Sequence, residues 1–83
     1  MDTTKTGSYL AALRKDAGMT QQETADRLGV SNKTISKWES GGGFPDIAIL
    51  PALAELYGVT ADDILAPPNS IYHITRFELS FTG

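Results

Sequence analysis

Four polar side chains between positions 32 and 37 have the types and the spacing needed to recognise a polar surface. They are Asn32, Lys33, Ser36 and Lys37. If this segment is helical, they share one face, while Ile35 and Trp38 share the opposite face at a spacing of three residues. An asparagine amide both donates and accepts hydrogen bonds, and a lysine ammonium donates them and carries charge. This face therefore predicts reversible hydrogen bonding to a polar or anionic surface, without any covalent bond being made or broken.

The residues that catalysis or metal binding would need do not occur in suitable combinations. The chain has no cysteine, and its single histidine, His73, has no metal-ligating partner at a recognisable spacing. Asp62 and Asp63 follow Glu55 closely, but no nucleophile, general acid or phosphate-binding loop accompanies them. The helix macrodipole favours acids at a helix start, which explains the two aspartates better. We expect that the protein is not an enzyme and that it binds no metal, no cofactor and no small-molecule ligand.

The distribution of charge is more informative than its sum. The net charge of −3 argues mildly against a nucleic-acid partner, because phosphate neutralisation supplies most non-specific affinity. Residues 27–38, however, carry Arg27, Lys33 and Lys37 and no acid, whereas residues 46–63 carry only acids. One segment is thus suited to meet a polyanion, and the other is suited to face away from it.

Helices must position these side chains, because the apolar residues follow a helical period between glycines and prolines. A first helix is expected over residues 8–17, with Leu10, Leu13 and Ala17 on its inner face and Gly18 as its end.

The next two helices are separated by a very short turn. Thr20 and Glu23 have the spacing of a capping box, which predicts a helix over residues 21–28. Ser31 caps a third helix over residues 32–40. Only two residues lie between the end of one helix and the cap of the next, so the helices must cross steeply, as in a helix-turn-helix.

Two more helices and a tail complete the chain. A turn leads into a fourth helix over residues 51–57 with Pro51 at its first position, and Thr60 caps a short fifth helix. We expect one helical domain over residues 1–66 and a separate C-terminal tail over residues 67–83. The tail alternates apolar and polar residues over 71–81, which is typical of a β-strand.

The segment TQQETADRLGVSNKTISKWESG, residues 20–41, resembles the helix-turn-helix of the Cro and lambda-repressor-like family, also called the XRE family. A small residue, a glycine and two apolar residues fall at the family's places, counted from Gln21: Ala25, Gly29, Ile35 and Trp38. The resemblance covers residues 7–65, including the phrase FPDIAILPALAELYGVTADDIL. This wider match resembles regulators common in low-GC Gram-positive bacteria.

The resemblance implies an all-α, five-helix domain that binds double-stranded DNA sequence-specifically and regulates transcription, as a repressor and as a homodimer. The third helix would read the major groove. The base-reading positions would be Asn32, Lys33, Ser36 and Lys37, and phosphate would be contacted by Gln21, Ser31 and Thr34. The family also pairs an arginine with a glutamate at the places of Arg14 and Glu39.

Two positions depart from the family's pattern. Thr24 stands where a larger aliphatic residue is usual, which puts the packing of the second helix in doubt. Gly41, Gly42 and Gly43 follow the third helix, where many relatives carry a basic residue that reaches a phosphate. This loop predicts either weaker electrostatic affinity or a contact made through backbone amides.

The role of the tail stays open at this stage. A lone strand cannot satisfy its own backbone, so residues 71–81 either pair with a second copy, stay disordered or lie across the helices of their own chain. A different class of function is an antitoxin-like interaction module that binds a protein through this tail. No stretch is long and apolar enough for a membrane span, and the first eight residues lack the apolar core of a secretory signal, so we expect a cytoplasmic protein.

Overall fold

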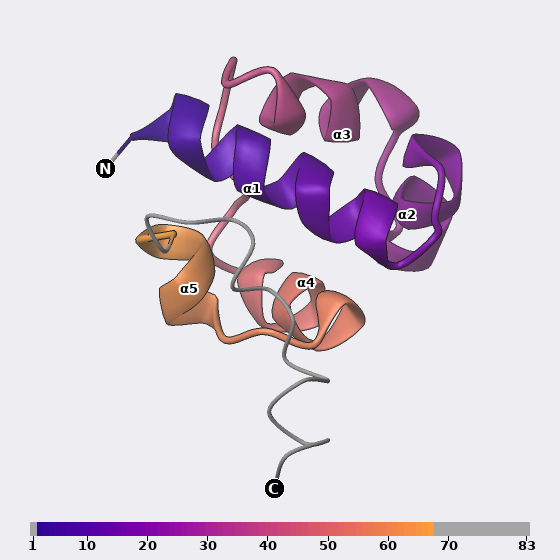
Figure 1. Ribbon diagram of the computed structural model, residues 1–83. Helices are drawn as coiled ribbons and strands as arrows, with labels where there is room; N and C mark the ends of the chain where they lie inside the picture. Colours follow the sequence, from indigo (N-terminus) through magenta and orange to yellow (C-terminus); the bar gives the residue numbers. More distant parts are fainter. Residues whose placement is uncertain (1, 68–83) are drawn as a thin grey trace, which may run out of the picture.

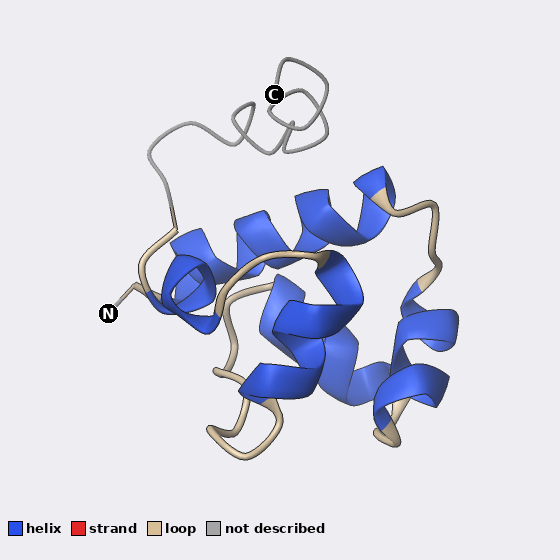
Figure 2. Cartoon of the chain, turned by 90° about the horizontal axis from the view of Figure 1, so that it is seen from below, coloured by secondary structure: helices blue, strands red, loops and turns tan. Residues whose placement is uncertain are grey.

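Five helices account for most of the structure, a computed structural model that describes residues 2–67 (Figure 1). They are α1 (Thr3–Asp16), α2 (Gln21–Leu28), α3 (Asn32–Glu39), α4 (Leu50–Tyr57) and α5 (Ala61–Leu65). Residues 2–67 contain no strand, which confirms the all-α class for this part of the chain (Figure 2). The predicted strand over residues 71–81 lies outside the described residues.

Helix α1 lies at the centre, with α3 along one side and α4 and α5 on the other (Figure 1). The apolar faces of the five helices meet around it. The buried apolar side chains are Tyr9, Leu10, Leu13, Ala25, Ile35, Trp38, Leu50, Leu53, Ala54, Tyr57 and Ile64. This core fixes the position of α3, because two residues of α3, Ile35 and Trp38, belong to it.

Local capping sets the ends of α2 and α5. The Thr20 hydroxyl accepts a hydrogen bond from the amide of Glu23 at 3.0 Å, and the Glu23 carboxylate accepts one from the amide of Thr20 at 2.8 Å. Thr60 and Asp63 make the same reciprocal pair at the start of α5. The capping box at Thr20 and Glu23 was predicted, whereas at α5 only the cap Thr60 was. Both boxes give hydrogen-bond partners to backbone amides that have none within the first helical turn. The predicted bounds of α2 are confirmed.

The first helix begins earlier than the sequence predicts, at Thr3 rather than Ser8. Asp2 caps it, since its carboxylate accepts from the amides of Thr4 and Lys5 at 3.0 and 3.2 Å. The prediction that Ala17 lies on the inner face is wrong, because Ala17 is the exposed C-cap residue beyond the last helical turn.

Thr24 packs well in spite of its departure from the family's pattern. It is fully buried, and its hydroxyl accepts a hydrogen bond of 3.3 Å from the Tyr57 hydroxyl. The pair ties α2 to α4, so a polar residue is accommodated without leaving an unpaired buried group. Within residues 2–67, no helix is long and apolar enough to cross a membrane.

Candidate nucleic-acid interface

A left-handed glycine makes the turn between α2 and α3. Gly29 has a φ of 72°, a conformation that costs a glycine little and other residues more. The amide of Val30 donates to the carbonyl of Ala25 at 3.0 Å, which closes the end of α2. The chain therefore reverses within two residues, and Ser31 already caps the next helix.

The register of α3 leaves one polar face in solvent. Ile35 and Trp38 are buried against the other helices. The four predicted base-reading residues are all exposed: Asn32, Lys33, Ser36 and Lys37. The structure thus brings all four together on one outer face of the helix, with two ammonium groups among them.

Ser31 and Thr34 lie at the N-terminal end of α3. The Ser31 hydroxyl accepts from the Thr34 amide at 3.2 Å, and the two hydroxyls lie 3.0 Å apart. Ser31 is exposed, whereas Thr34 is half-buried. Each therefore has a structural role in capping the helix, and Ser31 is the more accessible of the two to a ligand.

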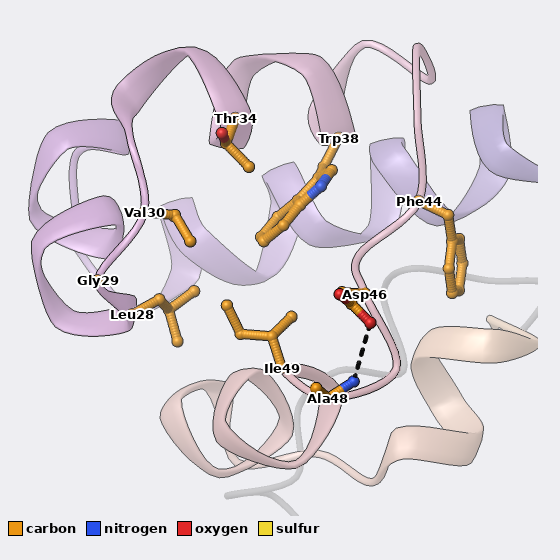
Figure 3. A pocket seen from close by; sticks show the side chains of 9 residues that line it. All are labelled: Leu28, Gly29, Val30, Thr34, Trp38, Phe44, Asp46, Ala48 and Ile49. Atoms are coloured by element: carbon orange, nitrogen blue, oxygen red, sulfur yellow. Dashed lines mark hydrogen bonds between the residues drawn. The ribbon is translucent and has the colours of Figure 1, made fainter.

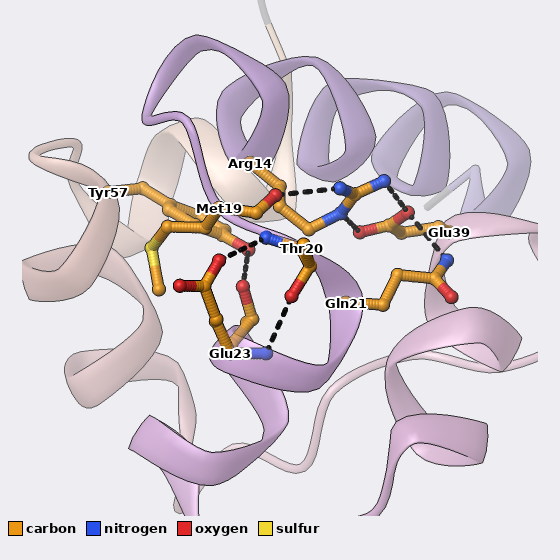
Figure 4. Close-up of polar contacts among 8 residues, drawn as sticks. Arg14, Met19, Thr20, Gln21, Glu23, Glu39 and Tyr57 are labelled. Carbon is orange, nitrogen blue, oxygen red and sulfur yellow. Dashed lines mark hydrogen bonds and ion pairs between the residues drawn. The ribbon is translucent and has the colours of Figure 1, made fainter.

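Gln21 begins α2 and is half-buried. Its side-chain amide donates to the Glu39 carboxylate at 3.1 Å (Figure 4). One of its two amide hydrogens is thus used inside the molecule, which fixes the side chain and leaves the other hydrogen for a further acceptor.

Arg14 and Glu39 form the ion pair that the resemblance implies. Arg14 Nε lies 2.7 Å from Glu39 Oε2, and Arg14 Nη2 lies 3.0 Å from Glu39 Oε1 (Figure 4). The side chains are only 13% and 8% exposed. Arg14 also donates to the carbonyl of Met19 at 2.8 Å. The hydrogen bond and charge of Glu39 raise the pKa of Arg14 above its ordinary value, so the guanidinium group stays charged.

The glycine loop after α3 uses its first amides internally. The amide of Gly41 donates to the carbonyl of Trp38 at 3.1 Å, and the amide of Gly42 donates to the carbonyl of Lys37 at 2.9 Å. These bonds satisfy carbonyls at the end of α3. Of the two alternatives for this loop, a phosphate contact through backbone amides is therefore disfavoured at Gly41 and Gly42, whose amides already have acceptors.

An open groove beside α3 was not predicted from the sequence. Its volume is about 540 Å³, and it lies between the α2–α3 turn and the segment that leads into α4 (Figure 3). The lining residues are Leu28, Gly29, Val30, Thr34, Trp38, Phe44, Asp46, Ala48 and Ile49. Asp46 shapes one wall by accepting a hydrogen bond of 3.2 Å from the amide of Ala48. The only signal in the sequence was a run of apolar residues before α4 without a helical period.

No group of three metal-ligating side chains converges anywhere in residues 2–67. The exposed face of α3 offers hydrogen-bond donors and acceptors held at a fixed spacing. Such a face is suited to recognition, and the N-termini of α2 and α3 add backbone amides beside it.

A helix-turn-helix family model matches residues 10–64, which is more than half of the chain. The chain belongs to the XRE-like helix-turn-helix family. This is a family of DNA-binding transcriptional regulators rather than of enzymes, and its members include bacterial proteins.

Individual relatives agree with this assignment. The HTH-type transcriptional activator BcrR of Enterococcus faecalis is 40% identical over 57 residues, which are 69% of this chain and 28% of BcrR. The HTH-type transcriptional regulator AnsR of Bacillus subtilis is 35% identical, with 88% of this chain and 69% of AnsR covered. The chain thus spans less than a third of the length of BcrR.

Solved structures show the same fold. The crystal structure of the clp gene regulator ClgR from C. glutamicum superposes with a TM-score of 0.67 at 26% identity, over 78% of this chain and 84% of that one. The helical arrangement of the family is therefore shared by residues well beyond the helix-turn-helix itself.

Proposed function

We propose that this protein binds double-stranded DNA sequence-specifically as a transcriptional regulator and places α3 in the major groove. The register of α3 carries the proposal: two buried apolar residues fix the helix, and four polar side chains lie on its outer face. The major groove is wide enough for one helix and presents a distinct pattern of donors and acceptors for each base pair.

Each residue of this face has a chemistry that suits a base edge. Asn32 can pair with adenine through two hydrogen bonds, and Lys33 and Lys37 can donate to O6 and N7 of guanine. Ser36 can donate to or accept from several bases. The order of bases that they read in an operator follows from their order along α3.

Three other residues contribute contacts to the phosphate backbone. Gln21 and Ser31 lie at the N-termini of α2 and α3, where amides and the helix dipole favour an anion, and Thr34 lies one turn into α3. Contacts of this kind position the protein on DNA but carry no sequence information.

We further propose a two-fold dimer that represses by occupying its operator. Residues 1–66 form the DNA-binding domain, and the tail at 67–83 pairs with its counterpart in a second copy. Repression needs no more than occupancy of a site that the polymerase must also use. The apolar, alternating pattern of the tail supports pairing, because an unpaired strand edge invites association with another strand.

A selection of bound sites from a random DNA library tests the proposal. We expect a defined two-fold sequence to emerge and to bind more tightly than random DNA at several salt concentrations. Equal binding to selected and random DNA would favour the antitoxin-like alternative, in which a protein is the partner.

Substitutions then separate base reading from phosphate contact. Lys37→Ala and Asn32→Ala should each weaken binding to the selected site by about 1–3 kcal/mol and relax preference at one base pair. Gln21→Ala serves as the matched control, since the loss of a phosphate contact should lower affinity by a similar factor on all sequences. If both α3 variants kept wild-type preference, the assignment of α3 would be wrong.

A further inference from the structure

The glycine loop after α3 lies along the side chain of Lys37. A Cβ atom built on Gly43 would lie 3.1 Å from Lys37 Cε, 3.5 Å from Cδ and 3.6 Å from Cγ. A Cβ atom on Gly42 would lie 3.3 Å from Lys37 Cγ. The aliphatic stem therefore runs against the backbone of the loop up to the carbon that bears the ammonium group.

Hydrogen bonds fix the loop relative to Lys37. The carbonyl of Lys37 accepts from the amide of Gly42 at 2.9 Å and from the hydroxyl of Ser40 at 3.0 Å. Gly41 takes a left-handed conformation, φ 82°, and packs against Thr4 of α1. The glycine loop that contacts the lysine stem is thus held by hydrogen bonds to α3 and by packing against α1.

From this contact we propose that Gly43 is a specificity-determining position, which acts by setting where the Lys37 ammonium lies above the outer face of α3. The inference rests on the proposed function of α3. A lysine stem is ordinarily flexible, with its charge free to move over several ångströms. A stem confined before binding directs its donors to one base. An N–H···O hydrogen bond spans only about 2.7–3.2 Å, so a shift of a few tenths of an ångström in the donor changes its strength.

The glycine at position 43 can be changed without straining the backbone. Its φ is not positive, in contrast to Gly41, so an alanine can adopt the same conformation. The three atoms that lie nearest to the new Cβ all belong to the Lys37 side chain. Gly43→Ala should therefore shift the end of Lys37 by a few tenths of an ångström and leave the helices in place.

A double-mutant cycle on the full chain tests the proposal. Wild type, Gly43→Ala, Lys37→Ala and the double variant are measured against the selected operator and its single base-pair changes. We expect Gly43→Ala to alter discrimination about fivefold or more, at the base pair that Lys37→Ala also affects and at no other. In the Lys37→Ala background, Gly43→Ala should have no further effect on discrimination between base pairs. The melting temperature of the single Gly43→Ala variant should match that of the wild type.

Lys33→Ala provides the matched control background, since Lys33 carries the same charge on the same face of α3. There the effect of Gly43→Ala should persist in full. Gly42→Ala is a second substitution, and it should act on the same base pair, because its Cβ also meets the Lys37 stem.

The outcomes separate a failure of the proposal for Gly43 from a failure of the base-reading assignment of α3. If Lys37→Ala relaxes preference but Gly43→Ala does not, the proposal for Gly43 is overturned and the function of α3 stands. An effect of Gly43→Ala that is equal on all sequences, or that survives in the Lys37→Ala background, also overturns it. If Lys37→Ala itself leaves preference unchanged, the base-reading assignment falls, and this proposal falls with it.

Discussion

Glu39 is the residue on which three segments of the chain converge. Its carboxylate accepts hydrogen bonds from Arg14 at the end of α1 and from Gln21 at the start of α2. The side chain is only 8% exposed. A charge that is buried to this degree is tolerated only while its partners are present.

Glu39→Ala should therefore destabilise the fold strongly. Breaking one side of a buried pair leaves the other charge uncompensated and costs about 3–5 kcal/mol. Glu55→Ala, the matched control, removes an exposed carboxylate from α4 and should cost within about 0.5 kcal/mol. Urea denaturation of the two variants gives the comparison. Small and equal losses of unfolding free energy in the two variants would show that the ion pair does not stabilise the fold.

Tyr57 and Thr24 form another buried polar contact inside the helical core. Burial raises the pKa of Tyr57, and the hydrogen bond to Thr24 opposes that effect only in part. The sequence marks Thr24 as an exception to the family's pattern, but not Tyr57 as its partner, because the two are 33 residues apart and helical periodicity carries no long-range information.

The raised pKa predicts a loss of stability at alkaline pH. The unfolded tyrosine ionises near pH 10, whereas the folded one resists ionisation, so this stability is complete below about pH 10 and is lost as the pH rises through the folded pKa. Tyr57→Phe cannot ionise and should show a shallower fall in unfolding free energy above pH 10. At neutral pH it should cost about 1 kcal/mol for the lost hydrogen bond. Identical alkaline slopes in the two proteins would contradict this reading.

Among the elements, those with local end signals were predicted well. The capping box at Thr20, the cap at Ser31 and the left-handed Gly29 lie within a few residues of the ends they set. The start of α1 was missed although Asp2 caps it locally, because the residues of its first turns do not favour a helix. Thr6 and Gly7 are poor helix formers, and they are helical here because α1 is held in place by contacts with distant elements. The Thr6 hydroxyl, for example, donates to the carbonyl of Ile64 at 3.0 Å.

Gly7 lies where α1 comes close to the backbone of α3. A Cβ atom there would lie 2.5 Å from the carbonyl oxygen of Trp38 and 2.8 Å from that of Glu39. Both oxygens belong to the backbone and cannot move aside as a flexible side chain can. The position of the outer face of α3 therefore depends on a residue of α1 that is not part of that face.

Gly7→Ala should destabilise the protein by about 1–3 kcal/mol, as overpacking does. The sign is diagnostic, because glycine to alanine inside a helix normally stabilises by about 0.5–1 kcal/mol. Ser8→Ala, at the exposed neighbouring position, should be neutral or slightly stabilising. Thermal melts of both variants check the prediction, and a stabilised Gly7→Ala would show that α1 and α3 can separate without cost.

At the scale of the whole molecule, the surroundings of the outer face of α3 depend on how distant segments pack, which the residues of that face do not indicate. The outward register of α3 could be predicted, because it follows from Ile35 and Trp38 alone. The groove beside Phe44 could not, since it depends on how the segment before α4 approaches the α2–α3 turn. Ile47, which lies between the lining residues Asp46 and Ala48 in the sequence, is 80% exposed although its side chain is apolar, and no sequence pattern indicated this.

The proposed dimer also belongs to this scale. Residues 68–83 of the tail lie outside the described residues, and the proposal rests on their apolar side chains: Ile71, Ile74, Phe77, Leu79 and Phe81. Two reading helices in successive turns of the major groove must lie about 34–36 Å apart, which needs a fixed link between two copies. Strand pairing across a two-fold axis would supply such a link and would give the backbone groups on one edge of each tail their partners.

Deletion of residues 69–83 should convert the dimer to a monomer in analytical sedimentation, with the helical circular-dichroism signal retained, because α1 to α5 end before the cut. The truncated protein should bind an isolated half-site as well as wild type does but lose most of its affinity for the full operator. Phe77→Lys, in the full-length chain, is the control for length, and it should weaken the dimer by placing a charge among the apolar side chains. A full-length chain that sediments as a monomer at high micromolar concentration would rule out pairing through the tail, and a truncated chain that remains a dimer would place the interface on the helices instead.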